Sequence, residues 1–390
     1  MAQFIFGEEQ LLAIRLAAQW ISSLSKMIFV IGGFAGTGKS SVLNQILANM
    51  GIPMYKVAFV TYTGKAAVVL RQKGLNAITI HKLIYNVSMG SSGKLSFRKK
   101  PRLPSNIELI CIDELGMVPN EIMDDLLSYG VPILALGDPG QLPPIFGENK
   151  YIVQPDVFLS TVYRNAGDVL RMATYIRNGE DAYNQTYGDD VKIYPFSKFD
   201  INLLLTYDQI LCSTNANKTI LNVKCRELLK FNTPLPQANE KVICVMNNFK
   251  DVIPYEGVDM FLVNGLTGIT TTEAKQIDEN VIYFRFKPDC MNHDIPIYAK
   301  KSLFMENYDT FGVKTEDASQ TQIMEFYQGK VVNSFNYGYA ITTHKSQGSE
   351  WNNILVYDDC FYNDDANYRR WLYTSVTRAK KTVSIIRSNL

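Results

Sequence analysis

The stretch Gly33-Phe-Ala-Gly-Thr-Gly-Lys-Ser40 decides the fold class, because it joins a predicted strand at residues 27–31 to a predicted helix at residues 41–50. A glycine-rich loop in this setting turns consecutive backbone N–H groups toward phosphate oxygens at the start of a helix. Lys39 supplies a point charge for the β- and γ-phosphates, and the Ser40 hydroxyl suits Mg²⁺. The stretch therefore predicts a domain that binds a nucleoside triphosphate.

Two carboxylates follow another short apolar strand. Asp113 and Glu114 come directly after the run at residues 109–112. Beside a phosphate loop, the first acid of such a pair holds Mg²⁺, and the second orients and deprotonates the attacking water. The pair therefore points to hydrolysis of the bound nucleotide.

Further apolar runs place both sites in a parallel sheet. The runs at residues 57–60 and 133–136 are short and continuous, which is typical of strands that are buried on both faces. Similar runs return in the second half of the chain, at residues 209–212, 339–342, 353–357 and 382–386. Because helical segments separate most of these strands, the sequence predicts an α/β fold with doubly wound parallel sheets.

Two segments interrupt the α/β pattern. Residues 84–104 contain the turn cluster Ser88-Met-Gly-Ser-Ser-Gly93 between two strand-like runs, which predicts a β-hairpin that projects from the first domain. Between residues 244 and 330 the helical alternation disappears, and strand-like runs are separated by Asn, Gly and Pro. We therefore expect a small β-rich insertion in a second α/β domain.

The composition excludes several classes of protein. The 390 residues suffice for about two to three domains, and 46% hydrophobic with 20% charged residues is ordinary for a globular chain. A net charge of +1 gives no global basic excess, so a nucleic-acid site has to come from local clustering. The six cysteines form no Cys-x-x-Cys pair and the three histidines lack zinc spacing, which argues against disulfides and structural zinc. Neither a membrane-length apolar run nor the basic start of a signal peptide is present, so we expect a cytosolic protein.

Four further segments, in this order along the chain, resemble motifs of superfamily 1 helicases. They are Gly137-Asp-Pro-Gly-Gln-Leu-Pro-Pro144, Val162-Tyr-Arg164, Thr342-Thr-His-Lys-Ser-Gln-Gly348 with Glu350, and Tyr373-Thr-Ser-Val-Thr-Arg-Ala379. The first of them, together with Thr79-Ile-His81, looks like the RecD, Dda and TraA group (subclass 1B) rather than the UvrD and Rep group. The compact length is most similar to the phage Dda-like helicases.

The resemblance implies a domain organisation. Two RecA-like P-loop NTPase domains are expected at residues 1–160 and 161–390. The hairpin at about residues 84–104 would be inserted in the first domain, and an SH3-like β-rich module at about residues 244–330 in the second. ATP would close the cleft between the two domains, and hydrolysis would release it.

The resemblance also implies roles around the nucleotide. Gln141 matches the glutamine that senses the γ-phosphate, whereas Arg164 and Arg378 match two arginines that approach it from the second domain. The implied catalytic residues are Lys39, Asp113, Glu114, Gln141, Arg164 and Arg378, with Ser40 and Asp113 at the Mg²⁺ ion. The implied ATP-binding residues are Gln10, which matches an adenine-recognising position, and Gly33, Gly36, Thr37, Gly38, Lys39, Ser40, Gly348 and Glu350.

DNA contacts are implied on both domains. The residues are Thr61, Thr63, Lys65, Thr79, His81, Thr343, His344 and Lys345. Hydroxyl groups and backbone amides grip phosphates without reading sequence, which suits a motor. In the hairpin, Leu95 and Phe97 form a candidate wedge for separating duplex DNA, and a solvated basic turn is the alternative interpretation.

The leading hypothesis is an ATP- and Mg²⁺-dependent DNA helicase that moves 5′ to 3′ on single-stranded DNA, in replication, recombination or repair. The alternatives are a translocase that displaces bound proteins with little unwinding, a UvrD-like enzyme of opposite polarity, and an inactive DNA-binding scaffold. The resemblance further implies a monomer that acts on single-stranded and fork DNA, beside a single-strand binding protein or replisome components and away from membranes. We expect the protein in the cytoplasm. If a phage encodes it, this is the cytoplasm of the bacterial host.

Overall fold

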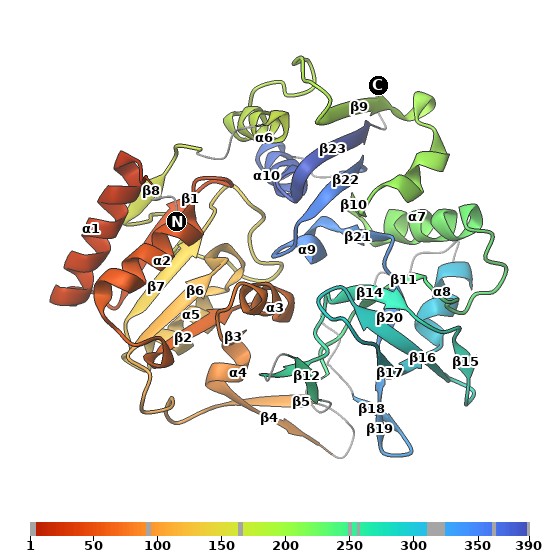
Figure 1. The fold of residues 1–390 in the computed structure, drawn as a ribbon, viewed down its shortest axis with the longest axis horizontal. Helices are drawn as coiled ribbons and strands as arrows, with labels where there is room; N and C mark the ends of the chain where they lie inside the picture. The colour runs from red at the N-terminus through yellow and green to blue at the C-terminus, as the bar shows by residue number, and fades with distance from the viewer. Residues whose placement is uncertain are drawn as a thin grey trace.

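The computed structural model describes residues 5–90, 95–162, 167–248, 252–255, 258–309, 324–360 and 364–387. Three large sheets organise the chain: two parallel sheets flanked by helices, and a third, mostly antiparallel sheet. Figure 1 shows the first unit on the left, the second at the upper right and the β-rich unit below the second.

The first sheet has six parallel strands in the order β3-β2-β6-β7-β1-β8. Its strands are β1 (Ile28–Gly33), β2 (Val57–Thr61), β3 (Ala77–Thr79), β6 (Leu109–Asp113), β7 (Ile133–Gly137) and β8 (Val157–Leu159). Its helices are α1 (Glu8–Ser23), α2 (Lys39–Met50), η1 (Met54–Lys56), α3 (Gly64–Gln72), α4 (Ile80–Ile84), η2 (Leu115–Met117) and α5 (Asn120–Leu127). Phe29 and Ile31 pack into one core and Val30 into another, so both faces are covered, as the continuous apolar runs predict.

The strand order brings the predicted catalytic segments together. Strands β6, β7 and β1 are neighbours and run in the same direction. Their carboxyl ends carry Asp113, Gly137 and Gly33, so the phosphate loop, the acidic pair and the Gly137–Pro144 loop start from one edge of the sheet. This edge is where ligands bind in open α/β sheets.

The second sheet is also parallel, in the order β21-β10-β22-β23-β9. Its strands are β9 (Val191–Pro195), β10 (Gln209–Cys212), β21 (Ala340–Thr342), β22 (Trp351–Asp358) and β23 (Ala379–Arg387). Its helices are α6 (Asp168–Asn178), η3 (Phe196–Lys198), η4 (Ile201–Thr206), α7 (Asn215–Leu228), α9 (Thr343–Ser346) and α10 (Asp365–Val376). A core around Trp371 joins α6 and α10 to this sheet.

The β-rich module is built on the order β18-β19-β17-β16-β14-β11-β20, with β15 paired to β16. Its strands are β11 (Lys241–Cys244), β14 (Thr267–Thr270), β15 (Lys275–Gln276), β16 (Val281–Pro288), β17 (Ile295–Lys300), β18 (Glu325–Tyr327), β19 (Lys330–Asn333) and β20 (Phe335–Tyr337). Helix α8 (Ser302–Asp309) and the small hairpin of β12 (Val252–Tyr255) and β13 (Val258–Phe261) accompany it. The sheet extends beyond the predicted residues 244–330 at both ends, because β11 begins at Lys241, β20 ends at Tyr337, and these two strands pair with each other.

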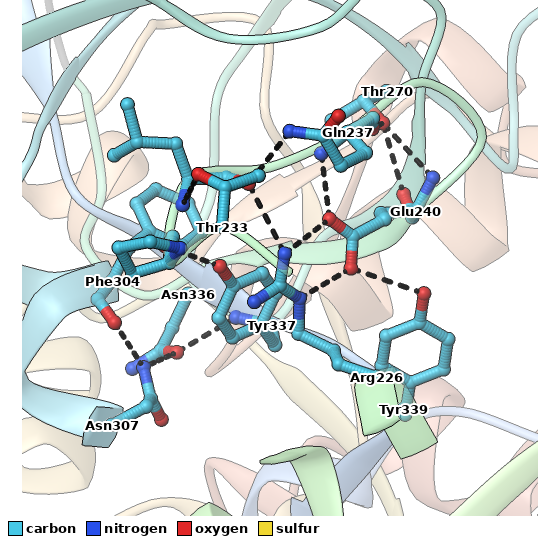
Figure 2. A network of polar contacts seen from close by, with 12 residues as sticks. Arg226, Thr233, Gln237, Glu240, Thr270, Phe304, Asn307, Asn336, Tyr337 and Tyr339 are labelled. Atoms are coloured by element: carbon cyan, nitrogen blue, oxygen red, sulfur yellow. Dashed lines mark hydrogen bonds and ion pairs between the residues drawn. The ribbon is translucent and has the colours of Figure 1, made fainter. Parts of the chain in front are cut away.

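A buried polar network fastens this module to α7 (Figure 2). The Arg226 guanidinium donates to both carboxylate oxygens of Glu240, at 2.6 and 3.0 Å, and it lies 4.3 Å from the ring centroid of Tyr337. Glu240 also accepts from the Gln237 N–H at 2.6 Å and from the Tyr339 hydroxyl at 3.4 Å. Since the Arg226 and Glu240 side chains are at most 1% exposed, the network sets how the module sits on the second domain.

A hairpin leaves the first domain and reaches the module, as Figure 1 shows at its lower edge. Strands β4 (Tyr85–Met89) and β5 (Leu95–Lys99) pair antiparallel, with Tyr85 opposite Lys99. Leu95 is buried in a small cluster with Met324 and Val331 of the module. The hairpin is therefore braced at its far end by the β-rich sheet.

No helix in the ranges given above has the length and apolar character needed to cross a bilayer.

Candidate nucleotide site and nucleic-acid channel

The phosphate loop has the backbone that its glycines allow. Gly36 and Gly38 have φ angles of 81° and 80°, a left-handed conformation that glycine adopts without strain. A Cβ atom on Gly38 would lie 2.5 Å from Gln10 Nε2, so the loop has no room for a side chain there. Lys39 Nζ donates to the carbonyl oxygens of Gly33 and Phe34, at 2.6 and 2.9 Å. The lysine charge thus lies against the loop in which we expect the phosphates.

Gln10 supports the loop from the first helix. Its side chain is fully buried, and its Nε2 donates to the Thr37 carbonyl at 2.9 Å. Its Oε1 accepts from the Gly7 N–H at 3.0 Å. Both ends of the amide are therefore engaged within the protein, and its adenine-recognising role stays a prediction.

The acidic pair lies at the end of β6. Asp113 Oδ1 accepts from the Glu114 N–H at 3.0 Å. Asp113 and Glu114 are half-buried, and this burial raises the pKa of both carboxyl groups, while the nearby Asp113 raises the pKa of Glu114 further. The charge of Lys39 opposes both increases, and the charge of Arg378 opposes the increase at Glu114. Residues from both domains thus act electrostatically on the carboxylate predicted to activate water.

The loop after β7 holds the predicted sensor glutamine. Asp138 is almost fully buried, and its Oδ1 accepts from the Gly140 N–H at 2.9 Å. The Gln141 amide donates to Asp138 Oδ2 at 3.5 Å, which is the long limit for a hydrogen bond. Gln141 remains half-buried, at the edge that also carries the phosphate loop.

Arg378 follows helix α10 and is held by three acceptors. Its Nε donates to Thr374 O at 3.0 Å, its Nη1 to Ser349 O at 3.3 Å, and its Nη2 to Thr377 Oγ1 at 3.2 Å. Beside it, the Ser349 hydroxyl is buried and finds no hydrogen-bond partner within the residues that the structure describes. The guanidinium is thus fixed next to an unused polar group. The second predicted arginine, Arg164, lies outside the described residues.

Gly348 and Glu350, predicted for ATP binding, flank the same segment. Gly348 has a φ of 73°, and a Cβ there would lie 2.9 Å from the Cβ of Ala66 in α3. The glycine therefore allows the second domain to approach the first closely. Glu350 is exposed.

The second domain touches the tip of the phosphate loop directly. The Tyr373 hydroxyl accepts from the Ala35 N–H at 3.0 Å, and the guanidinium of Arg177 in α6 lies 3.6 Å from the ring centroid of Phe34. The nucleotide site is therefore an interdomain site.

The residues at this site fit ATP with Mg²⁺. The Ser40 hydroxyl and the Asp113 carboxylate are the oxygen donors that Mg²⁺ prefers, and Mg²⁺ commonly completes its shell with substrate phosphates and water. Lys39 and the loop amides supply positive charge for the phosphates. When bound, Mg²⁺ would neutralise charge that develops on the phosphate oxygens.

A cavity of about 690 Å³ opens where the two domains and the β-rich module meet. Residues of the first domain, the second domain and the module all line it, among them Thr79, His344 and Asn264. Two loops of the nucleotide site reach it as well, through Met117, which follows the acidic pair, and Pro144, which follows Gln141. The cavity and the nucleotide site thus share structural elements.

Six of the eight predicted DNA-binding residues line this cavity: Thr63, Lys65, Thr79, His81, His344 and Lys345. Thr61 and Thr343 do not, because both side chains are fully buried. The Thr61 hydroxyl donates to Thr63 O at 2.8 Å, and the Thr343 hydroxyl is paired with Ser375 Oγ at 2.8 Å. The hydroxyl groups of both residues are therefore engaged within the protein and not at the cavity.

Lys65 lies at the junction of the three units. Its Nζ donates to Thr267 Oγ1 of the module at 3.3 Å and lies 5.0 Å from the ring centroid of Trp351 in the second domain. Burial lowers the pKa of this ammonium group to about 8, although the nearby Asp289 carboxylate acts in the opposite direction. Lys65 thus connects the first domain to the module and to the second domain, and it also lines the cavity.

Aromatic rings connect the cavity to the hairpin. The centroid of the His81 ring lies 5.5 Å from that of Tyr62, 5.7 Å from that of Tyr85 and 5.9 Å from that of Phe97. Burial lowers the pKa of His81 and of His344, which favours their neutral forms. Phe97 is 41% exposed, as a wedge requires, whereas Leu95 is 8% exposed and packs on the module.

Several cavity residues carry no local signal in the sequence. Asn247, Val263 and Asn264 of the module also line the cavity, yet no spacing pattern marks them. Ile145 and Phe146 are 63% and 59% exposed at the cavity and directly follow the two prolines of the Gly137–Pro144 loop. Two consecutive apolar residues directly after the conspicuous Pro-Pro loop were a signal that could have identified this pair.

Two protein families match separate parts of this chain, one in each half. Residues 8–193 match the family described as an AAA domain, and residues 337–386 match the UvrD-like helicase C-terminal domain. The RecD subunit of the RecBCD enzyme of Buchnera aphidicola is 22% identical, over 94% of this chain and 71% of that protein. The RecD2 DNA helicase of Deinococcus radiodurans is 24% identical, over 90% of this chain and 46% of that protein.

Among solved structures, Bacteroides Pif1 bound to single-stranded DNA is similar, with a TM-score of 0.53 and 17% identity over 98% of this chain and 92% of that one. This likeness confirms the expected fold of two RecA-like domains. The narrower likeness to the compact phage Dda-like helicases stays a prediction. The sequence motifs and the matches to both domains thus make the chain similar to the superfamily 1B helicases of the RecD/Pif1 type, and the fold agrees with that likeness.

Proposed function

We propose that this chain is an ATP- and Mg²⁺-dependent DNA helicase that moves 5′ to 3′ along single-stranded DNA and unwinds duplex DNA, in replication, recombination or repair. The main support for the proposal is that two loops of the nucleotide site also line the cavity. Met117 lies three positions after Glu114, and Pro144 lies three positions after Gln141, yet both line the cavity. A movement of either loop during hydrolysis therefore reaches the cavity directly.

The residues of the nucleotide site have separate tasks in hydrolysis. Lys39 and the loop amides bind the phosphates, Ser40 and Asp113 hold the Mg²⁺ ion, and Glu114 orients the attacking water and takes its proton. Arg378 stabilises the charge that develops on the γ-phosphate, together with Arg164, and Gln141 senses that phosphate. The amide of Gln141 suits this task, since it both donates and accepts hydrogen bonds.

The cavity is proposed as the channel for single-stranded DNA. Thr63, Thr79 and Lys345 would contact phosphates, and the rings of Tyr62, His81 and Phe146 offer apolar faces for bases. Related structures are described as Pif1 bound to single-stranded DNA and as Pif1 at forked double-stranded DNA, which supports the same class of ligand here. The exposed Phe97 is the residue we propose as the wedge.

The cellular setting belongs to the proposal as well. We infer a monomer in the cytoplasm that works on fork DNA near a single-strand binding protein or replisome components. A second candidate is a translocase that displaces bound proteins with little unwinding. The bracing of Leu95 by the module favours true unwinding, because a wedge has to be rigid to separate the strands of a duplex.

The test is the unwinding of a short duplex that carries either a 5′ or a 3′ single-stranded tail, with ATP and Mg²⁺. We expect unwinding from the 5′ tail only. Unwinding from the 3′ tail only would keep the motor and reverse the polarity. If DNA stimulates ATP hydrolysis but neither substrate is unwound, the translocase is correct, and hydrolysis that ignores DNA would favour a scaffold.

A further inference from the structure

Tyr373 of α10 connects two loops of the opposite domain through its hydroxyl group. We propose that Tyr373 is a positioning residue for ATP hydrolysis, which holds the Gln141 loop in its working position only while the second domain is docked. The inference rests on the proposed function and deepens it, because it names the contact through which domain closure reaches the γ-phosphate sensor.

The hydroxyl of Tyr373 uses both its donor and its acceptor capacity across the domain boundary. It donates to Asp138 Oδ2 at 2.7 Å and accepts from the Ala35 N–H at 3.0 Å. The side chain is only 2% exposed, so water cannot easily replace either bond. A buried hydrogen bond to a carboxylate is stronger than one between neutral groups, and losing its partner is costly. The tyrosine therefore ties the phosphate loop to the Asp138 loop from the opposite domain.

Asp138 transmits this contact to the sensor. Its other carboxylate oxygen accepts from the Gly140 N–H at 2.9 Å, and the Gln141 amide lies 3.5 Å from the oxygen that Tyr373 also uses. Two further second-domain side chains hold the next residue. The Thr374 hydroxyl accepts from the Leu142 N–H at 2.9 Å, and the Gln347 amide donates to the Leu142 carbonyl at 3.1 Å.

Gln141 is thus bracketed by anchors that belong to the other domain. If the second domain moves away, Asp138 and Leu142 lose these partners and the loop between them is released. Helix α10 also leads into Arg378, so one rigid element sets the sensor loop and delivers the arginine. The arrangement makes the alignment of Gln141 conditional on closure, which is what a motor needs to couple hydrolysis to domain movement.

The test compares two Tyr→Phe substitutions on the same helix. Tyr373→Phe removes only the hydroxyl that spans the two domains. Tyr368→Phe is the matched control, since its hydroxyl also donates to a carboxylate, Asp358 at 2.7 Å, but within the second domain. We expect basal kcat without DNA to fall about tenfold in Tyr373→Phe, within the range typical of coupling between sites, and to stay near wild type in Tyr368→Phe.

A double-mutant cycle separates positioning from general damage. If Tyr373 acts through Gln141, Tyr373→Phe should lower kcat much less in a Gln141→Ala background than in the wild type. An equal loss in both backgrounds, an unchanged basal kcat in Tyr373→Phe, or an equal loss in Tyr368→Phe would each overturn the inference. The basal rate reports on Tyr373, whereas stimulation of the wild type by DNA reports on the proposed function, so the two can fail separately.

Discussion

Replacing Arg226 by methionine should strongly destabilise the junction between the second domain and the β-rich module. Methionine roughly keeps the volume but removes the two bonds to Glu240 at 2.6 and 3.0 Å. The Glu240 carboxylate, which is 0% exposed, would then keep only the Gln237 N–H and the Tyr339 hydroxyl among the partners described above. Removing one partner of a buried ion pair costs about 3–5 kcal/mol. For a cooperative unit of about 200 residues, this corresponds to a fall in melting temperature of about 10 °C.

A second ion pair on the same helix provides the control. Lys224 Nζ lies 2.9 Å from Glu227 Oε2, but the two side chains are 43% and 58% exposed. Because exposed pairs contribute about 0–1 kcal/mol, Lys224→Met should change the melting temperature little. Both variants would be followed by thermal unfolding, monitored by circular dichroism. The reasoning is refuted if Arg226→Met melts no lower than Lys224→Met.

A double substitution tests the cause of the loss. In Arg226→Met with Glu240→Leu, the unpaired buried charge is gone, so much of the lost stability should return. The module contributes Asn247 and Asn264 to the cavity, so Arg226→Met should also weaken binding of single-stranded DNA. If stability falls but the double substitution restores none of it, the loss comes from packing rather than from the charge.

Three further outcomes are expected. Lys39→Ala should abolish ATP hydrolysis but leave nucleotide-free DNA binding largely intact, because Lys39 does not line the cavity. Retained turnover in a phosphate-release assay would contradict the assignment of Lys39 to the nucleotide site. Phe97→Ala should impair unwinding of a forked duplex more than DNA-stimulated ATPase, and an equal loss of both activities would exclude the wedge. Burial lowers the pKa of Lys65 to about 8 in the folded chain, so above pH 8 the folded chain binds fewer protons than the unfolded chain. The free energy of unfolding that Lys65 contributes therefore increases as the pH rises from 8. The free energy of unfolding of Lys65→Met, measured relative to wild type by urea denaturation, should therefore be lower at pH 10 than at pH 7.5, and a difference independent of pH contradicts the assigned burial.

Much of the fold is readable from local sequence. A strand buried on both faces has to be apolar along its length, so β1, β2, β6 and β7 each show as a short apolar run. The phosphate loop is readable because its backbone demands glycine where φ is positive, as at Gly36 and Gly38. The β-rich module is less readable at its limits, since β11 and β20 are recognisable as its edge only once they pair across the intervening chain.

The candidate site divides in the same way. Lys39, Ser40, Asp113 and Glu114 are identified by residue type beside a strand end, because that chemistry needs those groups at a fixed place in the chain. Thr61 and Thr343 are predicted as DNA contacts, yet their burial, like that of Leu95 against the module, depends on packing that no local pattern records. Burial and partner choice are properties of the assembled surfaces.

The sequence by itself determined the fold class, the phosphate loop and the acidic pair, because each follows from backbone geometry or from side chains a few positions apart. Only the tertiary structure decided how the two domains communicate. The Tyr373 hydroxyl meets Ala35 from 338 positions away and Asp138 from 235 positions away. Contacts over such separations form only when whole domains dock. The hydrogen-bond partners of a hydroxyl that is buried by docking are therefore set by the docked arrangement and not by the local sequence.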